Sequence, residues 1–262
     1  MSTLLLDGDI FLFEAAMAAE KEVQWTEYIW TLHSNLEEVQ AIVERNVSRI
    51  AAKLEATEIV FALSCPKEQR FRPRIMPTYK SNRVDARKPV AYGAAREWAK
   101  ERFNVEEWPG CEGDDVLGVL ATCGQYDEPI MVSNDKDLMT IPGTLYRPMN
   151  REVVVSTETQ ANRFWLKQTL MGDRTDGYDG IPGIGPKSSE KILDQATQSL
   201  VEAEEPVTPD NLWPFIVAAY AAKGLGERIA LQNAQMARIL RSSDYDIQSQ
   251  EVTLWEPSSL GA

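Results

Sequence analysis

Short apolar runs that end at acidic residues constrain the fold of this chain more than any other sequence feature. Residues 3–6 form such a run before an Asp-Gly-Asp sequence, and residues 130–133 form another before Asn134 and Asp135. Residues 58–63 form a similar run, which is followed by Ser64. Each run has the length and composition of a buried strand. Helices are predicted between and beside these runs: residues 10–22 are rich in Ala and Glu, and residues 36–54 have apolar residues at helical spacing. Further helices are expected near 91–103 and from 113 onward. Strands that alternate with helices predict an α/β fold with a mostly parallel central sheet flanked by helices.

The pattern changes near residue 157. Beyond it the apolar spacing is helical almost throughout, apart from a strand-like stretch near 251–255 and an acidic, proline-broken connector at 201–210. We therefore expect two portions, an α/β core at 1–157 and a mainly helical portion at 158–262.

The ionisable residues exclude several classes of protein. Lys and Arg number 27 against 40 Asp and Glu, which gives a net charge of −13, and there are three cysteines and one histidine. Such a set favours neither a disulfide framework nor a zinc site, and histidine-based catalysis would depend on His33 alone. The N-terminus lacks a basic, signal-like region, and no apolar run is long enough to span a membrane. We expect a cytoplasmic monomer without membrane contact.

Acidic residues follow the predicted strands or open and close the predicted helices. In an open parallel sheet the carboxyl ends of the strands meet at one edge, where ligands bind. Repulsion among so many carboxylates there would cost many kcal/mol without cations, and a histidine-free oxygen set suits Mg²⁺ or Mn²⁺. A single aspartate, such as Asp114, is equally typical of a helix cap or a turn. The full set is Asp7, Asp9, Glu112, Asp114, Asp115, Asp135, Asp137, Asp173 and Asp176.

A glycine-rich turn at 180–188 separates two helical segments. Gly183 and Gly185 permit a tight turn with exposed N–H groups, and Lys187 and Ser188 add a charge and a hydroxyl at the start of the next helix. This pattern is typical of a helix-hairpin-helix, which binds the DNA backbone without reading sequence. The alternative is a plain corner between two helices.

The segment 67–88 is basic in an otherwise acidic chain. It holds eight Lys and Arg residues against two acidic ones, a local charge of +6, with Phe71 and Tyr79 interleaved. Basic side chains attract phosphodiesters, and aromatic rings stack on bases. A solvated surface is the alternative, but the sign of the charge opposes that of the whole chain.

The motifs LLLDGD, YKSNR, EGDD, SNDKD and GDRTDGYDGIPGIGPKSSEKIL occur in an order and spacing that resemble the 5′-nuclease (flap endonuclease) superfamily, most closely the 5′→3′ exonucleases of bacteriophages. The resemblance implies a PIN-like nuclease core followed by the helix-hairpin-helix. It also implies metal-dependent hydrolysis of DNA at 5′ ends and flaps in replication, repair or recombination. The motifs leave open whether RNA–DNA hybrids are further substrates.

The resemblance assigns roles to residues that match the motifs. Lys80 and Arg83 would be catalytic within a helical gateway at about 67–90, and Tyr79 and Arg72 would bind substrate there. In the turn, Gly183, Gly185, Lys187 and Ser188 would hold duplex DNA, with a possible K⁺ ion. Two or more Mg²⁺ or Mn²⁺ ions would be bound by Asp7, Glu112, Asp114, Asp115, Asp135, Asp137, Asp173 and Asp176.

The chain departs from the family pattern at one position. The second strand usually precedes a metal-binding aspartate, but FALSCPKE places Ser64 there. Either Ser64 or water would fill that coordination position, or the alignment is shifted.

Two other functions fit part of the sequence. A haloacid-dehalogenase phosphatase would use Asp7 as nucleophile and Asp9 as acid, but it gives no role to EGDD, SNDKD or the glycine-rich turn. A non-catalytic DNA-binding module would have lost several carboxylates, whereas only the position of Ser64 lacks one.

Overall fold

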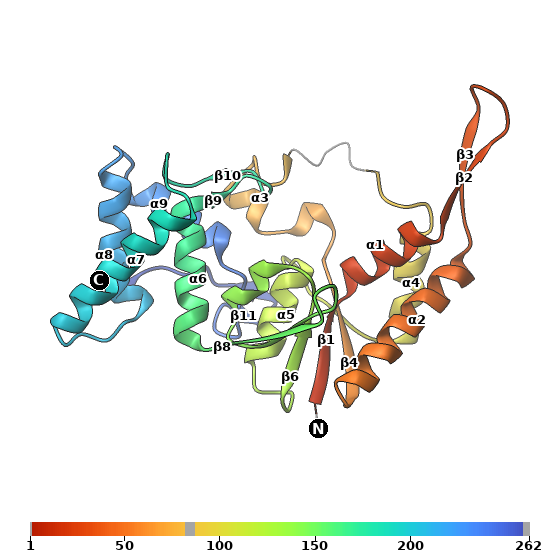
Figure 1. The fold of residues 1–262 in the computed structure, drawn as a ribbon, viewed down its shortest axis with the longest axis horizontal. Coiled ribbons are helices and arrows are strands. Elements are labelled where there is room, and N and C mark those ends of the chain that lie inside the picture. Colours follow the sequence, from red (N-terminus) through yellow and green to blue (C-terminus); the bar gives the residue numbers. More distant parts are fainter. Residues whose placement is uncertain (1, 82–86, 259–262) are drawn as a thin grey trace.

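The structure is a computed structural model that describes residues 2–81 and 87–258. Its centre is a six-stranded sheet in the order β5-β4-β1-β6-β7-β8, in which all neighbours are parallel except β7 and β8. The predicted α/β fold with a mostly parallel sheet is confirmed (Figure 1). The strands are β1 (Ser2–Asp7), β4 (Ala56–Leu63), β5 (Asn104–Glu107), β6 (Pro129–Val132), β7 (Gly143–Arg147) and β8 (Glu152–Ser156).

Helices cover both faces of this sheet. One face packs against α1 (Gly8–Ala18), α2 (Leu36–Lys53) and α4 (Tyr92–Arg102), and the other packs against α5 (Gly113–Thr122). Side chains of β1 alternate between the two cores, because successive residues of a strand point to opposite faces. Leu4 and Leu6 enter the first core and Leu5 enters the second, and all three are fully buried.

The C-terminal portion is mainly helical, as predicted. A third core forms where Trp165 and Trp213 each make an edge-on contact with Trp255. Tyr79 belongs to the same core, so the basic segment packs against the helical portion. Here the helices are α6 (Glu158–Met171), α7 (Pro186–Glu202), α8 (Pro209–Ala221) and α9 (Glu227–Ala237), and the expected last strand is reduced to β12 (Glu251–Val252), paired with β11 (Tyr245–Asp246).

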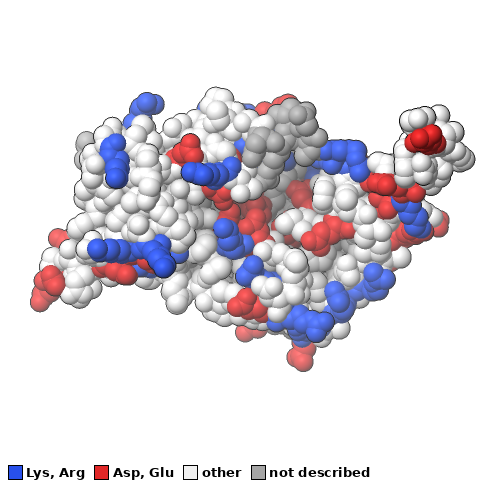
Figure 2. Space-filling view, turned by 45° about the horizontal axis from the view of Figure 1, so that its top comes forward, with Lys and Arg blue, Asp and Glu red and all other residues white. Residues whose placement is uncertain are grey.

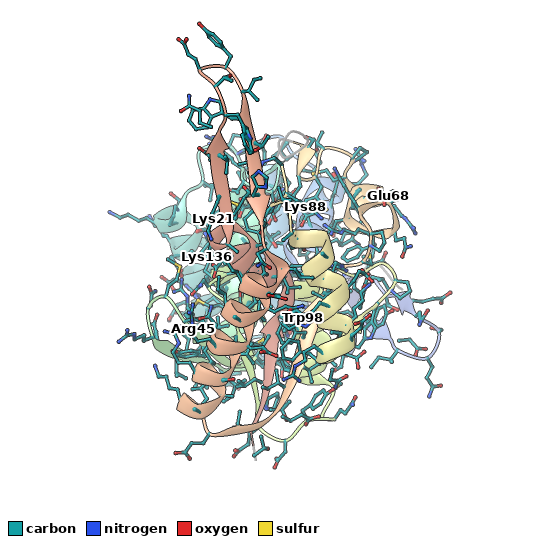
Figure 3. All side chains as sticks on the ribbon, turned by 90° about the vertical axis from the view of Figure 1, so that its right-hand side faces the viewer. Lys21, Arg45, Glu68, Lys88, Trp98 and Lys136 are labelled. Atoms are coloured by element: carbon teal, nitrogen blue, oxygen red, sulfur yellow. The ribbon has the colours of Figure 1, made fainter. Side chains whose placement is uncertain are left out.

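The helix predicted at 10–22 begins and ends earlier in the structure, where α1 starts at Gly8 and ends at Ala18. The next residues form β2 (Glu20–Gln24), which pairs with β3 (Trp30–Ser34) in a hairpin that projects from the body (Figures 1 and 3). Aromatic and β-branched residues between 23 and 32 favour this extended structure. Nowhere in the ranges described is a helix both long enough and apolar enough to cross a lipid bilayer.

Candidate metal centre

The predicted acidic residues gather at the carboxyl edge of the sheet. Asp7 is the last residue of β1, and the neighbouring β6 is followed closely by Asp135 and Asp137. A cleft of about 800 Å³ opens at this edge, and Figure 2 shows acidic side chains in its floor with Lys and Arg side chains around it. Its acidic lining comprises Asp7, Asp9, Glu97, Glu107, Glu112, Asp114, Asp135, Asp137, Asp173 and Asp176.

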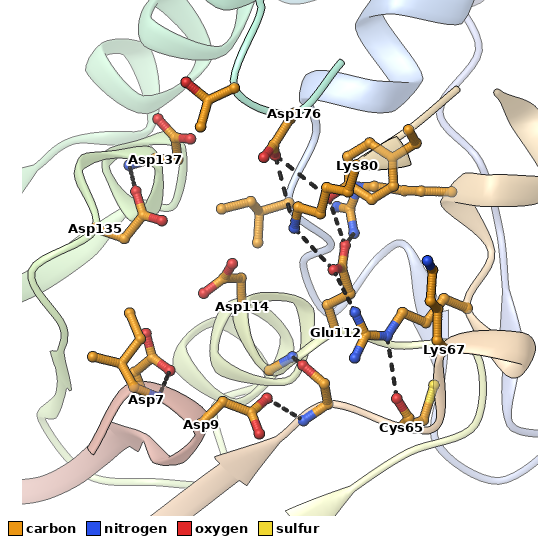
Figure 4. A pocket seen from close by; sticks show the side chains of 18 of the residues that line it. Asp7, Asp9, Cys65, Lys67, Lys80, Glu112, Asp114, Asp135, Asp137 and Asp176 are labelled. Carbon is orange, nitrogen blue, oxygen red and sulfur yellow. Dashed lines mark hydrogen bonds and ion pairs between the residues drawn. The ribbon is translucent and has the colours of Figure 1, made fainter. Parts of the chain in front are cut away.

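Asp7 and Asp114 face the centre of the cleft (Figure 4). The Asp7 carboxylate accepts hydrogen bonds from Ser133 Oγ (2.8 Å) and Ile10 N (3.2 Å). Burial, reinforced by nearby carboxylates, raises the pKa of Asp7 to about 7. Burial, followed by the charges of Asp7 and Asp135, raises the pKa of Asp114 well above its ordinary value. In this part of the cleft, the negative charge of the carboxylates therefore exceeds the positive charge of the nearby Lys and Arg side chains.

Asp135 and Asp137 lie on a short turn after β6. Asp135 caps this turn by accepting a hydrogen bond from Asp137 N (2.8 Å), and Gln168 on α6 donates to Asp137 Oδ1 (2.6 Å). Burial and then the charge of Asp135 raise the pKa of Asp137 to about 6. Sequence analysis missed Gln168, because nothing in the sequence distinguishes it from other polar residues of that helix.

Asp173 and Asp176 lie on the turn joining β9 (Gly172–Asp173) to β10 (Tyr178–Asp179). Asp173 Oδ1 accepts hydrogen bonds from the backbone of Thr175 (2.7 Å) and Asp176 (3.3 Å). Lys80 N donates to the carbonyl of Asp176 (2.8 Å), so this turn is joined to the basic segment. Gly172 has φ +70°, and a Cβ atom there would lie 2.1 Å from Gly180 N, which excludes any larger residue.

Glu112 receives four donors from the basic segment. Lys80 Nζ (2.9 Å) and Arg70 Nη1 (3.0 Å) contact Oε1, while Tyr79 OH (2.7 Å) and Arg72 Nη1 (3.0 Å) contact Oε2. Burial by itself would raise the pKa of Glu112, but the three cations lower it to about 2. These side chains point into the acidic cleft, which argues against a merely solvated face. Arg83, the second predicted catalytic residue, lies outside the described residues.

Arg72 and Asp115 form a buried ion pair and do not have the roles predicted for them. Arg72 was expected to bind substrate and Asp115 to bind metal, yet both are buried and form a two-pronged ion pair of 2.6 and 2.7 Å. Asp115 also accepts hydrogen bonds from the backbone of Glu112 (3.0 Å) and Leu240 (3.2 Å). Asp115 is fully buried and does not line the cleft, and it holds the Arg72 guanidinium inside the protein, so we correct both assignments. The pair instead joins α5 to the basic segment.

Ser64, at the position where the resemblance implies an aspartate, is used locally. Its hydroxyl accepts a hydrogen bond from Gly113 N (2.8 Å) at the start of α5, and its own N–H donates to Asp9 Oδ2 (2.8 Å). The other oxygen of Asp9 accepts from Tyr92 OH (2.7 Å) and Arg96 Nη1 (2.8 Å). Arg96 and Tyr92 were not predicted, because they share no motif with the residues they contact.

The turn at 180–188 leads into α7 and lies on the surface. Gly183 is exposed and has φ +81°, a conformation that favours glycine. No side chain caps the helix at Gly185, and a Cβ atom there would meet nothing within 4 Å. Lys187 and Ser188 are exposed on the first turn. Uncapped backbone N–H groups at the start of a helix can bind an anion, which is compatible with the predicted contact with DNA phosphates. That contact stays a prediction.

Comparisons with known proteins assign the chain to a family. The sequence profile described as "5′-3′ exonuclease, N-terminal resolvase-like domain" matches residues 2–164. The chain belongs to this 5′–3′ exonuclease family. It is 30% identical to the exodeoxyribonuclease of Enterobacteria phage T3, over 98% of this chain and 93% of the relative. It is also 30% identical to the exonuclease of Escherichia phage T7, over 97% and 93%.

A solved structure shares the fold of this chain. A bacteriophage T5 protein co-crystallised with metal ions matches with a TM-score of 0.64 and 16% identity, over 90% of this chain and 89% of the other. Membership of the exonuclease family, shown over residues 2–164, replaces the haloacid-dehalogenase alternative.

The donor set fits hard divalent ions. The centre of the cleft offers carboxylate oxygens without histidine, the preferred surroundings of Mg²⁺ and Mn²⁺. Within the described ranges, no group of three or more Asp, Glu, Cys or His side chains already forms an ion-binding cluster. Bound ions would therefore draw neighbouring carboxylates together. Burial and neighbouring carboxylates raise the pKa values of Asp7 and Asp137, and a cation bound beside them would lower both.

Proposed function

We propose that this protein is a divalent-metal-dependent 5′→3′ exonuclease that also cleaves 5′ flaps, by hydrolysing DNA phosphodiester bonds. The observation that carries the proposal is one cleft in which the carboxylates lie beside Lys80 and Arg70 of the basic segment. A phosphodiester entering it would meet cations on one side and metal-binding oxygens on the other. The names of the T3 and T7 relatives, exodeoxyribonuclease and exonuclease, support this activity.

Two or more Mg²⁺ or Mn²⁺ ions are the cofactors we propose. Bound ions would lower the pKa of a water molecule and stabilise charge on the leaving 3′ oxygen. The chain's own groups hold the carboxylates in place: Ser133 fixes Asp7, and Gln168 fixes Asp137. The proposed ligands are Asp7, Glu112, Asp114, Asp135, Asp137, Asp173 and Asp176.

The substrate is DNA with a 5′ end or flap, and RNA–DNA hybrids are a further substrate. Lys80, Tyr79 and Arg83 grip the strand next to the scissile phosphate. The turn at 180–188 holds the duplex through backbone N–H groups, Lys187 and Ser188, with K⁺ as a possible ion there. The protein acts as a monomer, in DNA replication, repair or recombination in the cytoplasm.

The test is cleavage of end-labelled duplex and 5′-flap DNA by Asp135→Asn/Asp137→Asn. We expect cleavage to fall by at least about a thousandfold, since removing ligands removes the ions' contribution to the transition state. DNA binding is expected to persist or improve, because two charges that repel phosphate are lost. A matched control is Glu204→Gln/Glu205→Gln, which removes two exposed acids outside the cleft. Wild-type turnover by the aspartate variant at saturating Mg²⁺ would refute the proposal.

A further inference from the structure

The ammonium of Lys80 lies between two of the proposed metal ligands. Its Nζ is 2.9 Å from Glu112 Oε1 and 3.8 Å from Asp176 Oδ2, and Figure 4 shows it between these carboxylates. Glu112 belongs to the start of α5, whereas Asp176 belongs to the β9–β10 turn. A cation of the protein itself therefore joins acidic groups from the two portions of the chain.

We propose that Lys80 is a built-in counter-ion of the metal centre, which a divalent ion must displace. The inference rests on the proposed function, because it concerns the same carboxylates. A carboxylate oxygen that faces an ammonium at 2.9 Å is not available to an ion in the same direction. The Lys80 charge also opposes the approach of another cation, and it is only 19% exposed, so solvent screens it weakly.

The surroundings of Lys80 fix its ammonium at this place. The backbone N–H donates to the carbonyl of Asp176 (2.8 Å), and φ is +52°, which is uncommon for a residue other than glycine. The ammonium also lies 4.7 Å from the centre of the Tyr79 ring, and the Tyr79 hydroxyl contacts Glu112. Arg70 and Arg72 remain on Glu112 when Lys80 leaves, so Glu112 is not left as an isolated buried charge.

Competition for Lys80 couples metal binding to DNA binding. One ammonium cannot pair fully with Glu112 and Asp176 and, at the same time, with a phosphate of the substrate. An ion that displaces Lys80 makes it available to the phosphate, and a phosphate that engages Lys80 removes a positive charge from beside the carboxylates that bind the ion. By linkage, each ligand raises the affinity for the other by the same factor.

Calorimetric titration with Ca²⁺ as the probe tests the competition without relying on activity. We expect Lys80→Met to bind Ca²⁺ at least about fivefold more tightly than the wild type, since one positive charge beside the site is gone. Lys80→Arg keeps the charge and should bind at or near the wild-type affinity. Lys67→Met is the matched control: Lys67 lines the same cleft, and no ion pair is found for it in the described part of the chain. It should change the affinity by less than about twofold.

The coupling is tested by repeating the titration with a 5′-flap oligonucleotide that carries a non-hydrolysable linkage. DNA should tighten Ca²⁺ binding in the wild type and in Lys67→Met, and much less in Lys80→Met. Unchanged or weaker Ca²⁺ binding by folded Lys80→Met, or coupling equal to that of the wild type, would overturn the inference. If no variant and no wild-type protein binds Ca²⁺, Mg²⁺ or Mn²⁺, the proposed metal centre itself fails. Thermal unfolding of each variant shows that it is folded.

Discussion

Asparagine at position 114 and at position 115 should have opposite effects, although the two aspartates are adjacent on α5. Asp115 forms a buried ion pair with Arg72, so Asp115→Asn should destabilise the fold and leave metal affinity nearly intact. Asp114 faces the cleft among other carboxylates, so Asp114→Asn should leave stability nearly intact and weaken metal binding. The pair of variants thus separates a structural acid from a ligand.

The contacts of Asp115 set the size of its effect. Its oxygens accept two hydrogen bonds from Arg72 and two from backbone N–H groups, and none of its surface is exposed. Removing one partner of a buried ion pair costs about 3–5 kcal/mol. Glu112 remains 3.0 Å from Arg72 and still neutralises it, so we expect the lower end, about 3 kcal/mol. In a domain of this size, that lowers the melting temperature by roughly 6–12 °C.

The expected effects of Asp114→Asn on stability and metal affinity follow from the carboxylates around Asp114. Burial and the charges of Asp7 and Asp135 raise its pKa, so the charged form is unfavourable in the metal-free protein. Replacing it with neutral asparagine should therefore change the stability by less than about 1 kcal/mol. Loss of one anionic ligand should weaken divalent-ion binding by at least roughly tenfold, because losing even a residue that only supports a ligand typically costs about 10–100-fold in metal affinity.

Unfolding by heat and urea in EDTA measures the stability of both variants, and calorimetry with Ca²⁺ measures their metal affinity. Arg72→Met completes a double-mutant cycle with Asp115→Asn, where we expect a coupling of about 1–3 kcal/mol. If Asp115→Asn loses as much metal affinity as Asp114→Asn while keeping its melting temperature, then Asp115 is a metal ligand and not a structural partner of Arg72.

Three further outcomes follow from the proposed function. Gly185→Val/Lys187→Ala should weaken duplex binding by about 1–3 kcal/mol and affect a dinucleotide ester much less; equal losses on both substrates would place the turn in the active site or in folding. Lys80→Ala/Arg83→Ala should lower kcat more than affinity and make the salt dependence of binding shallower by about one unit per lost phosphate contact, and unchanged single-turnover rates would refute this role. EDTA followed by dialysis should abolish cleavage, with recovery on adding Mg²⁺; activity that survives the treatment contradicts a metal mechanism.

The fold was predictable where hydrophobic periodicity is strong. The run at 3–6 and the helical spacing at 36–54 correspond closely to β1 and α2, because burial on one or both faces dictates the pattern. Prediction failed after residue 18, where alanine and glutamate favour a helix locally. There the chain pairs with Trp30–Ser34, which lies beyond the range of local propensity. The antiparallel edge strand β8 was missed although its pairing with β7 is local, since Arg147 pairs with Glu152 across a short turn.

Within the site, sequence alone placed the carboxylates at strand ends but did not distinguish their roles. Adjacent residues of a helix point about 100° apart, so Asp114 and Asp115 inevitably have different surroundings. Which of them faces the cleft depends on Arg72, which lies 43 residues before Asp115 and meets it only in the folded chain. The YKSNR motif likewise identified Lys80, but its position between Glu112 and Asp176 is a property of the tertiary structure.

The cleft shows why counting acidic residues overstates the charge that ions must neutralise. Several of the acids already have a partner of their own: Arg96 contacts Asp9, and Lys80 contacts Glu112. The absence of an aspartate at Ser64 fits this balance, because Asp9 accepts the Ser64 N–H there and its charge is already offset. Across the described ranges, five aspartates that line the cleft have no Lys or Arg within 4 Å, so bound ions would supply most of the positive charge beside them: Asp7, Asp114, Asp135, Asp137 and Asp173.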